Sequence, residues 1–144
     1  MYFKNASAGL YKDYSDIEGC IGSMMDIVTK TPGMIYQVNT LGGRIQDKAS
    51  SQTSSFAYRN HLFFSELQTY WEQPSQGKKL MEKFAAVQQV VSSHGITAQY
   101  RNYPDGQFKD PLSSYYGENL SKLKKVKSKY DPEDVFHYEQ SIRS

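Results

Sequence analysis

The sequence is poor in cysteine, in long apolar runs and in net charge. Cys20 is the only cysteine among 144 residues, so no internal disulfide can form and no cysteine-based metal cluster is available. No apolar run reaches the roughly 18 residues of a membrane span, and the first residues lack the basic and apolar regions of a signal peptide. The formal net charge of +2 does not indicate a nucleic-acid partner. We therefore expect neither metal, membrane nor nucleic acid, and localisation stays open.

What the chain does contain is an excess of tyrosine in a polar background. Its mean hydropathy is −0.68 and 38% of its residues are hydrophobic, yet 14% are aromatic, with twelve tyrosines. Disordered chains are poor in aromatic residues. Tyrosine is typical of surfaces that are half buried against a ligand or a partner. By length the chain is one domain.

Periodicity and turn residues predict an α+β fold, an antiparallel sheet with helices packed on one face. Ser15 and Glu18 are spaced as a capping box at the start of the first helix, and Gly42-Gly43 is typical of a hairpin turn. In chain order we expect a strand within 1–14, a helix from 15 to about 31, strands at 34–41, 44–46 and 61–71, a helix from an N-cap at Ser75 to His94, a strand at 96–103, and a lysine-rich, solvent-facing helix between Gly117 and Asp131.

The strand predicted at 61–71 has an unusual face. Alternation places Phe64, Glu66, Gln68 and Tyr70 together, so polar groups lie among aromatic rings. A half-exposed carboxylate on a plain strand is one reading of Glu66. The other reading is a binding surface, on which partial burial would raise the pKa of the Glu66 carboxyl.

The end of the chain carries four distinctive blocks. They are Tyr100-x-Asn102-Tyr103, Tyr115-Tyr116-Gly117-x-Asn119, Val126-Lys127-x-Lys129-x-Asp131-Pro132, and Phe136 with Gln140-Ser141-Ile142. Their order and spacing resemble the C-terminal signature of the berberine-bridge-enzyme-like family of FAD-linked oxidases. Weaker matches, Gly42-Gly43 and Phe56-x-x-Arg59, extend the resemblance from about residue 34 to the end. Tyr58 stands where the family usually has His, and Pro111 where Trp is common.

The resemblance implies part of a larger two-domain flavoprotein fold. Residues 1–106 would be a partial substrate-binding domain, and residues 107–144 a tail that packs back on an FAD-binding domain. Nothing in the sequence resembles the segment that attaches FAD in full-length members. It follows that the chain alone is not expected to be catalytically competent.

In such enzymes a hydride moves to the flavin while a base takes a proton from the substrate. By resemblance, Tyr103 is the candidate base, and Glu66 is its rival. Because the pKa of tyrosine is ordinarily near 10, Tyr103 would need a nearby positive charge to act near neutrality. Strand alternation puts Arg101 on the same face, where it is expected to lower that pKa. A plain reading of Tyr103 is a strand-end tyrosine bonded to backbone.

The remaining candidates surround these two. Asn102 and Tyr100 are the expected cofactor-binding residues, for FAD. The expected substrate-binding residues are Gln68, Arg101 and Phe64. The substrate would be a small alcohol, sugar or alkaloid-like molecule, and the tyrosine-rich face would need a companion FAD-binding domain or self-association.

Two other functions remain open. The chain could be a truncated product without flavin that binds a partner at most. It could also be a freestanding α+β binding module unrelated to flavoenzymes, in which case the four blocks would coincide by accident. Flavin absorbance with and without an added N-terminal domain separates the truncated product from the first interpretation, which does not expect these 144 residues alone to bind flavin tightly.

Overall fold

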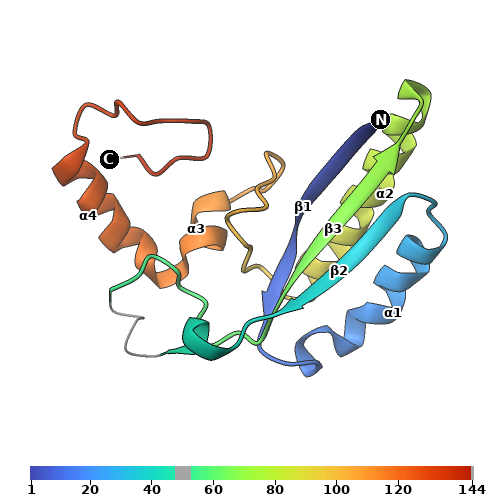
Figure 1. Ribbon diagram of the computed structural model, residues 1–144, viewed down its shortest axis with the longest axis horizontal. Helices are drawn as coiled ribbons and strands as arrows, with labels where there is room; N and C mark the ends of the chain where they lie inside the picture. Colours follow the sequence, from blue (N-terminus) through green and yellow to red (C-terminus); the bar gives the residue numbers. More distant parts are fainter. Residues whose placement is uncertain (48–52, 144) are drawn as a thin grey trace.

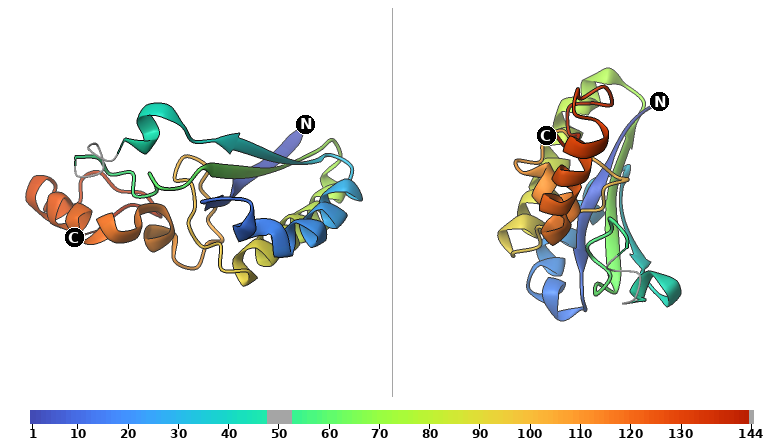
Figure 2. Two further views of the ribbon diagram at one scale, coloured as in Figure 1. Left: turned by 90° about the horizontal axis from the view of Figure 1, so that it is seen from below. Right: turned by 90° about the vertical axis from the view of Figure 1, so that its left-hand side faces the viewer.

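The computed structural model describes residues 1–47 and 53–143. Its centre is a three-stranded antiparallel sheet in the order β1-β3-β2, formed by β1 (Tyr2–Tyr11), β2 (Met34–Thr40) and β3 (Phe63–Trp71). Two helices, α1 (Ser15–Thr29) and α2 (Pro74–Ser93), lie side by side on one face of the sheet (Figures 1 and 2). The predicted fold class, an antiparallel α+β sheet with helices on one face, is confirmed.

The core lies between the sheet and these helices. Leu67, on the central strand, is completely buried and is flanked by Ala6 of β1 and Tyr36 of β2 in the sheet register. Met24 of α1 and Phe84 of α2 close over it, also without exposed surface. The period of two in β3 therefore assigns Leu67 to the core and its neighbours Glu66 and Gln68 to the opposite, open face.

A bulge in β1 shapes the edge of the sheet. The register shifts between Ser7 and Leu10, and Gly9 has φ +112°, where a Cβ would lie 2.4 Å from Ile96 Cγ2. Glycine thus permits residues 96–103 to pass close to β1. Two backbone hydrogen bonds join them to it, from Leu10 N to the Ala98 carbonyl (2.9 Å) and from Ser7 N to the Tyr103 carbonyl (2.8 Å). In addition, Tyr100 N donates to the side chain of Ser7 at 2.8 Å.

The strand predicted at 96–103 does not form. Its backbone is shared between two partners, because Gln99 N donates to the Ser114 carbonyl at 2.8 Å while Ala98 and Tyr103 accept from β1. The chain then turns, with Tyr103 N donating to the Tyr100 carbonyl at 3.0 Å. The bulge and this turn prevent a continuous ladder.

Two local predictions in the first half of the chain are also wrong. Residues 44–46 are not a return strand but belong to the 3₁₀ helix η1 (Gly43–Gln46), which Gly43 enters with φ +59°. Ser15 is the first helical residue of α1 rather than its cap, and its N–H donates to Asp13 Oδ1 at 2.8 Å. Asp13 thus accepts from the Ser15 amide, which a capping box would leave to the side chain of Glu18.

The cap of α2 also differs from the prediction. Ser75 lies inside that helix, whose N-terminus is closed by a reciprocal pair of Gln73 and Gln76 side chains. The end of the helix, by contrast, agrees with the sequence. Its C-cap is His94, and Gly95 follows with φ +82°.

The last part of the chain forms a tail beyond the end of the sheet at which β1 and β2 end (Figure 1). It comprises α3 (Pro111–Tyr116), which the sequence did not predict, the 3₁₀ turn η3 (Gly117–Asn119) and α4 (Leu120–Tyr130), which it did. Asp110 caps α3 by accepting from Ser113 N at 3.2 Å. The final residues fold back beside α4, so the tail is a compact unit with its own contacts.

Lys127 is an exception to the solvated face expected for the lysines of α4. Its Nζ lies 2.8 Å from Asp134 Oδ1 and pairs with Asp131. It also donates to the Phe136 carbonyl at 2.6 Å. Asp131 in turn accepts from the backbone N–H groups of Val135 and Phe136. This network holds the folded-back segment against the end of α4.

The described residues contain neither a membrane-spanning helix nor a metal-binding cluster. None of their helices combines the length and the apolar composition that crossing a bilayer requires. Within residues 1–47 and 53–143, no group of three histidine, cysteine or acidic side chains is placed to hold a metal ion.

Candidate functional site

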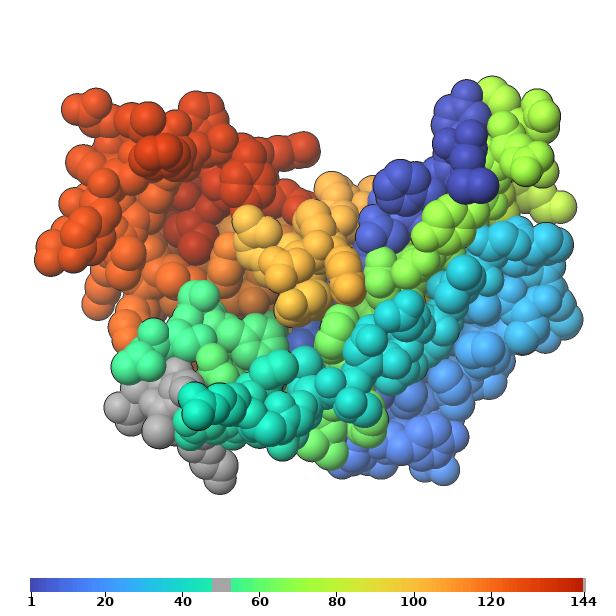
Figure 3. All heavy atoms as spheres, in the orientation of Figure 1, coloured from blue at the N-terminus to red at the C-terminus, as the bar shows by residue number. Residues whose placement is uncertain are grey.

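Three aromatic rings join the sheet to the segment at residue 100. Phe64 of β3 lies 4.8 Å from Tyr100 and 6.1 Å from Tyr103, measured between ring centroids. The two tyrosine rings are 5.3 Å apart at a steep angle. The segment occupies the space between sheet and tail (Figure 3). Two regions that the sequence singled out separately, β3 and Tyr100–Tyr103, therefore meet in the fold.

Glu66 lies on the open face of the central strand, next to this cluster. It is 4% exposed and is opposed by Ser7 of β1 and Gln37 of β2. Its Oε1 accepts a hydrogen bond from Asn5 Nδ2 at 2.8 Å. A buried carboxylate held by a neutral amide can still accept a proton, which suits it to the role of a base.

Tyr103 is a poorer base in this environment than the sequence suggested. Burial raises the pKa of its phenol above the ordinary value, and the negative charge of nearby Glu66 raises it further. The expected lowering by Arg101 is wrong. Arg101 Nε donates to the Tyr116 hydroxyl at 2.8 Å, and its Nη2 donates to the Tyr138 hydroxyl. The turn at residues 100–103 cancels the strand alternation that would have placed Arg101 beside Tyr103.

The other predicted residues fall on two sides of Tyr100. Gln68 remains on the sheet face, where its Oε1 accepts from the Tyr70 hydroxyl at 2.8 Å. Asn102 Nδ2 donates to the Tyr100 hydroxyl at 3.0 Å. The structure thus groups Phe64, Glu66, Gln68 and Tyr103 at the sheet, and Tyr100, Arg101 and Asn102 in a neighbouring cavity.

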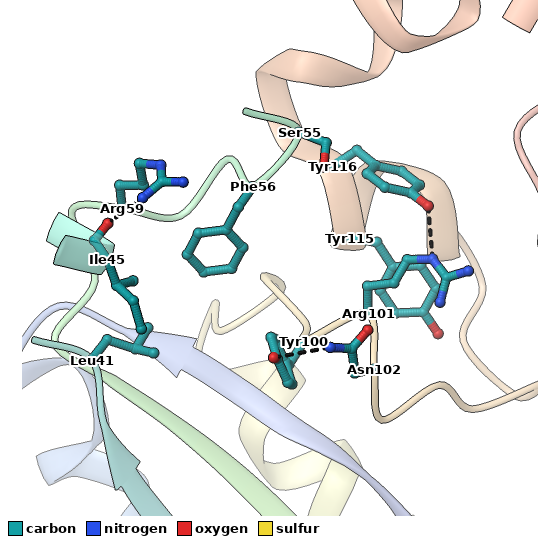
Figure 4. A pocket seen from close by; sticks show the side chains of 10 residues that line it. All are labelled: Leu41, Ile45, Ser55, Phe56, Arg59, Tyr100, Arg101, Asn102, Tyr115 and Tyr116. Atoms are coloured by element: carbon teal, nitrogen blue, oxygen red, sulfur yellow. Dashed lines mark hydrogen bonds between the residues drawn. The ribbon is translucent and has the colours of Figure 1, made fainter. Parts of the chain in front are cut away.

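This cavity has a volume of about 480 Å³ (Figure 4). It opens between the end of β2, the segment around Phe56, and α3. The side chains of Phe56 and Tyr100 point into the same space (Figure 4). Its lining consists of Leu41, Ile45, Ser55, Phe56, Arg59, Tyr100, Arg101, Asn102, Tyr115 and Tyr116.

Sequence reasoning missed the contacts that Asp105 makes in the turn after Tyr103. Asp105 is 3% exposed, and its Oδ1 lies 2.6 Å from Lys4 Nζ. Its backbone N–H donates to the Tyr115 hydroxyl at 3.2 Å, and its carbonyl accepts from Gln140 Nε2 at 2.7 Å. Tyr115 and Gln140 belong to the four distinctive blocks. The Tyr115 hydroxyl also donates to the Gln140 side chain at 3.1 Å, so the two residues that hold the Asp105 backbone are bonded to each other. Only the block spacing could have hinted at a shared partner.

Tyr58, which departs from the family pattern, has a structural role. Its hydroxyl donates to the Ser114 carbonyl at 2.6 Å and lies beside Gly117, where a Cβ would be 3.4 Å away. It therefore ties the segment that forms one wall of the cavity to α3. Burial raises the pKa of this phenol, so it stays a hydrogen-bond donor.

The sheet face and the neighbouring cavity together offer aromatic rings, the amides of Gln68 and Asn102, and the buried carboxylate of Glu66. Such a set can stack against a planar ring, donate hydrogen bonds to its edge and accept a proton from a bound molecule. The same sheet face continues into exposed apolar residues, with Phe3 65% and Ile35 48% exposed. These residues lack a covering layer within the described chain.

Comparison with known sequences places the chain among flavin enzymes. Residues 99–143 match the model of the family described as berberine and berberine like. The chain is 31% identical over 118 residues to the uncharacterized FAD-linked oxidoreductase YvdP of Bacillus subtilis, covering 82% of this chain and 26% of that protein. It is 33% identical over 118 residues to a chitooligosaccharide oxidase of Gibberella zeae, covering 74% of this chain and 23% of the oxidase.

Solved structures agree over almost the whole chain. The wild-type BBE-like 1 protein of Physcomitrella patens superposes with a TM-score of 0.81 at 25% identity, covering 97% of this chain and 30% of that protein. The chain therefore spans less than a third of the relatives that it matches. Over that span, sequence blocks, sheet and tail agree, and the chain belongs to the berberine-bridge-enzyme-like family of FAD-linked oxidoreductases.

Proposed function

We propose that this chain supplies the substrate-side part of an FAD-linked oxidoreductase. Residues 1–106 would form part of a substrate-binding domain, and residues 107–144 a tail that packs against an FAD-binding domain. The exposed apolar end of the open sheet face, at Phe3 and Ile35, supports this assignment because such a surface suits burial against another domain. The share of each relative that the chain covers is consistent with the assignment.

The observation that supports the proposal is that Glu66 and Tyr103 lie close to each other. The two groups interact electrostatically, and both adjoin the ring of Phe64 or its strand. An oxidation that removes a hydride from a C–H bond also needs a proton acceptor for the adjoining hydroxyl or amine. A buried carboxylate beside a phenol provides that acceptor.

Glu66 is the better acceptor in this environment. Since the pKa of Tyr103 is raised, its hydroxyl keeps its proton near neutrality and can donate a hydrogen bond to the substrate oxygen. Glu66 then takes the substrate proton, and Asn5 holds its carboxylate in place. Phe64 and Gln68 orient the substrate on the sheet face, Phe64 by ring contact and Gln68 by hydrogen bonding.

FAD fits the residues next to this pair. Tyr100 presents a ring at the edge of the cluster, and Asn102 donates to its hydroxyl, leaving the amide oxygen free to contact a ligand. When bound, FAD would accept the hydride. Tyr100 and Asn102 would hold the flavin edge, while the aromatic cluster excludes water from the reacting atoms.

The test is a chimera in which this chain replaces the matching segment of the chitooligosaccharide oxidase. We expect the chimera to bind flavin and its flavin absorbance to bleach with a sugar substrate. Glu66→Gln should slow the bleaching at least a hundredfold, whereas Tyr103→Phe should slow it less, because general-base catalysis contributes roughly 10²- to 10⁴-fold. The matched control is Glu82→Gln, a change of the same kind on an exposed position of α2.

A flavin-loaded chimera in which Glu66→Gln reacts normally would exclude Glu66 as the base. A larger loss with Tyr103→Phe would return that role to Tyr103. A folded chimera that never binds flavin would contradict the proposal itself and favour a partner-binding module.

A further inference from the structure

We propose that the cavity of Figure 4 is an anion subsite that takes the carboxylate or phosphate of a ring-bearing ligand, with Arg101 as its main cation. Where the anion belongs to the substrate, this inference rests on the proposed function. Binding of an anion by the chain does not depend on flavin chemistry, so the two can fail separately.

The charged side chains that line the cavity are all positive among the described residues. Arg59 and Arg101 both line the cavity, and no carboxylate is found among its described lining residues. Arginine guanidinium groups bind planar oxyanions with two parallel hydrogen bonds. A cavity with two such groups and no acidic counterpart is suited to a ligand that brings the negative charge itself.

The partners of Arg101 among the described residues are neutral. Its guanidinium bonds to the hydroxyls of Tyr116 and Tyr138 and lies 5.3 Å from the ring centroid of Tyr138. These contacts position the group at the cavity wall without cancelling its charge, and they leave other N–H groups of the guanidinium for a ligand. Figure 4 shows Arg101 bonded to Tyr116, with Asn102 nearby at the same wall. Asn102 adds an amide donor or acceptor next to the cation.

Arg59 supplies a second cation at the cavity. Its Nη atoms donate to the Ile45 carbonyl at 2.7 Å and to Ser54 Oγ at 2.8 Å. These partners are neutral, as are those of Arg101. The positive charge of Arg59 therefore adds to that of Arg101 at the lining of the cavity.

The remaining walls favour a ring over a free ion. Phe56, Tyr100, Tyr115 and Tyr116 present aromatic surface. The volume of about 480 Å³ exceeds what a small inorganic anion needs and falls in the range of small-molecule sites, roughly 300–1,000 Å³. The ligand that fits is therefore a carboxylate or phosphate attached to a sugar-sized or aromatic ring.

The experiment compares matched neutral and anionic probes by calorimetric titration of the whole chain. The pairs are 4-hydroxybenzyl alcohol with 4-hydroxybenzoate, glucose with glucuronate, and riboflavin with FMN. We expect the anion of at least one pair to bind tenfold or more tightly than its neutral counterpart, and this preference to weaken as salt rises. A preference confined to FMN assigns the subsite to a cofactor phosphate. A preference for benzoate or glucuronate assigns it to a substrate carboxylate.

Variants distinguish the binding of the anion by Arg101 from the hydrogen bonds that hold Arg101 in place. Arg101→Gln should abolish the preference, Arg101→Lys should retain part of it, and Lys79→Gln, which removes the same charge from the exposed surface of α2, should leave it intact. Tyr138→Phe removes a phenol that anchors Arg101 but keeps the guanidinium, so the preference should survive. Equal affinities within all three pairs would overturn the proposal, as would a preference that survives Arg101→Gln in a folded protein.

Discussion

Lys4 Nζ lies 2.6 Å from Asp105 Oδ1 and thereby joins the first strand to the turn that follows Tyr103. The two residues are 101 positions apart in the chain. The same turn is held from the other side by Tyr115 and Gln140 of the tail. Sheet and tail thus converge on Asp105, the sheet through its carboxylate and the tail through its backbone, and the position of Tyr103 depends on both.

Breaking this ion pair should destabilise the fold. Lys4→Met leaves Asp105 buried without its cation, and Asp105 Oδ2 already lacks a partner among the described residues. Losing one partner of a buried pair costs on the order of 3 kcal/mol. Urea unfolding measures the loss, and Lys79→Met on exposed α2 is the control. A change no larger than that of the control would mean that solvent replaces Lys4.

The bulge at Gly9 should tolerate no side chain. Gly9→Ala places a Cβ 2.4 Å from Ile96 Cγ2 at φ +112°, so we expect a loss of roughly 1–3 kcal/mol, as for other strained backbone sites. The matched control is Gly22→Ala in α1, where a Cβ meets nothing within 4 Å. Because alanine favours helix, that variant should gain up to about 1 kcal/mol. Thermal unfolding compares the two, and equal melting temperatures would contradict the packing described for Ile96.

The segment of the tail that folds back beside α4 should be held less firmly at low pH. Hydrogen bonds from Lys127 lower the pKa values of Asp131 and Asp134. Because these values are lower in the folded state, the stabilisation is complete above the unfolded aspartate pKa, near 3.9, and is lost as pH falls through the folded values.

Hydrogen exchange at the amides of Val135 and Phe136, which donate to Asp131, reports this loosening. Lys127→Met should make exchange at these amides fast already at neutral pH. Lys124→Met, on an exposed position of the same helix, is its control. Equal protection in both variants would show that Lys127 does not hold the segment.

Glu66 should control the titration of Tyr103. The charge of Glu66 contributes to the raised pKa of the Tyr103 phenol, so Glu66→Gln should move that pKa downward. Carbon NMR of labelled tyrosine ring positions, with Tyr103→Phe for assignment, follows it directly. Arg101→Leu, by contrast, should leave it nearly unchanged, since Arg101 bonds to Tyr116 and Tyr138. A clear rise in the Arg101→Leu variant would restore the expectation based on strand alternation.

Much of the sheet and helix layer could be predicted from local patterns. The alternation at 63–71 separates Leu67 from Glu66, and the apolar period at Leu80, Phe84, Val87 and Val91 defines the buried side of α2. These patterns suffice because side-chain direction in regular elements follows the backbone period. The family blocks can likewise be identified from the sequence alone, without knowledge of their contacts.

The site required the tertiary structure. Whether residues 96–103 form a strand depended on the bulge at Gly9 and on competition from Ser114, neither of which a local pattern records. The direction of the Arg101 side chain depended in turn on the absence of that strand.

By itself, the sequence determined the family, the antiparallel α+β class and the polar face of β3, because each is written in residue type and spacing. Only the tertiary structure decided which charges meet. Glu66 rather than Arg101 acts on Tyr103, and Lys4 reaches Asp105. Electrostatic effects depend on distance through space, and residues far apart in the chain set those distances.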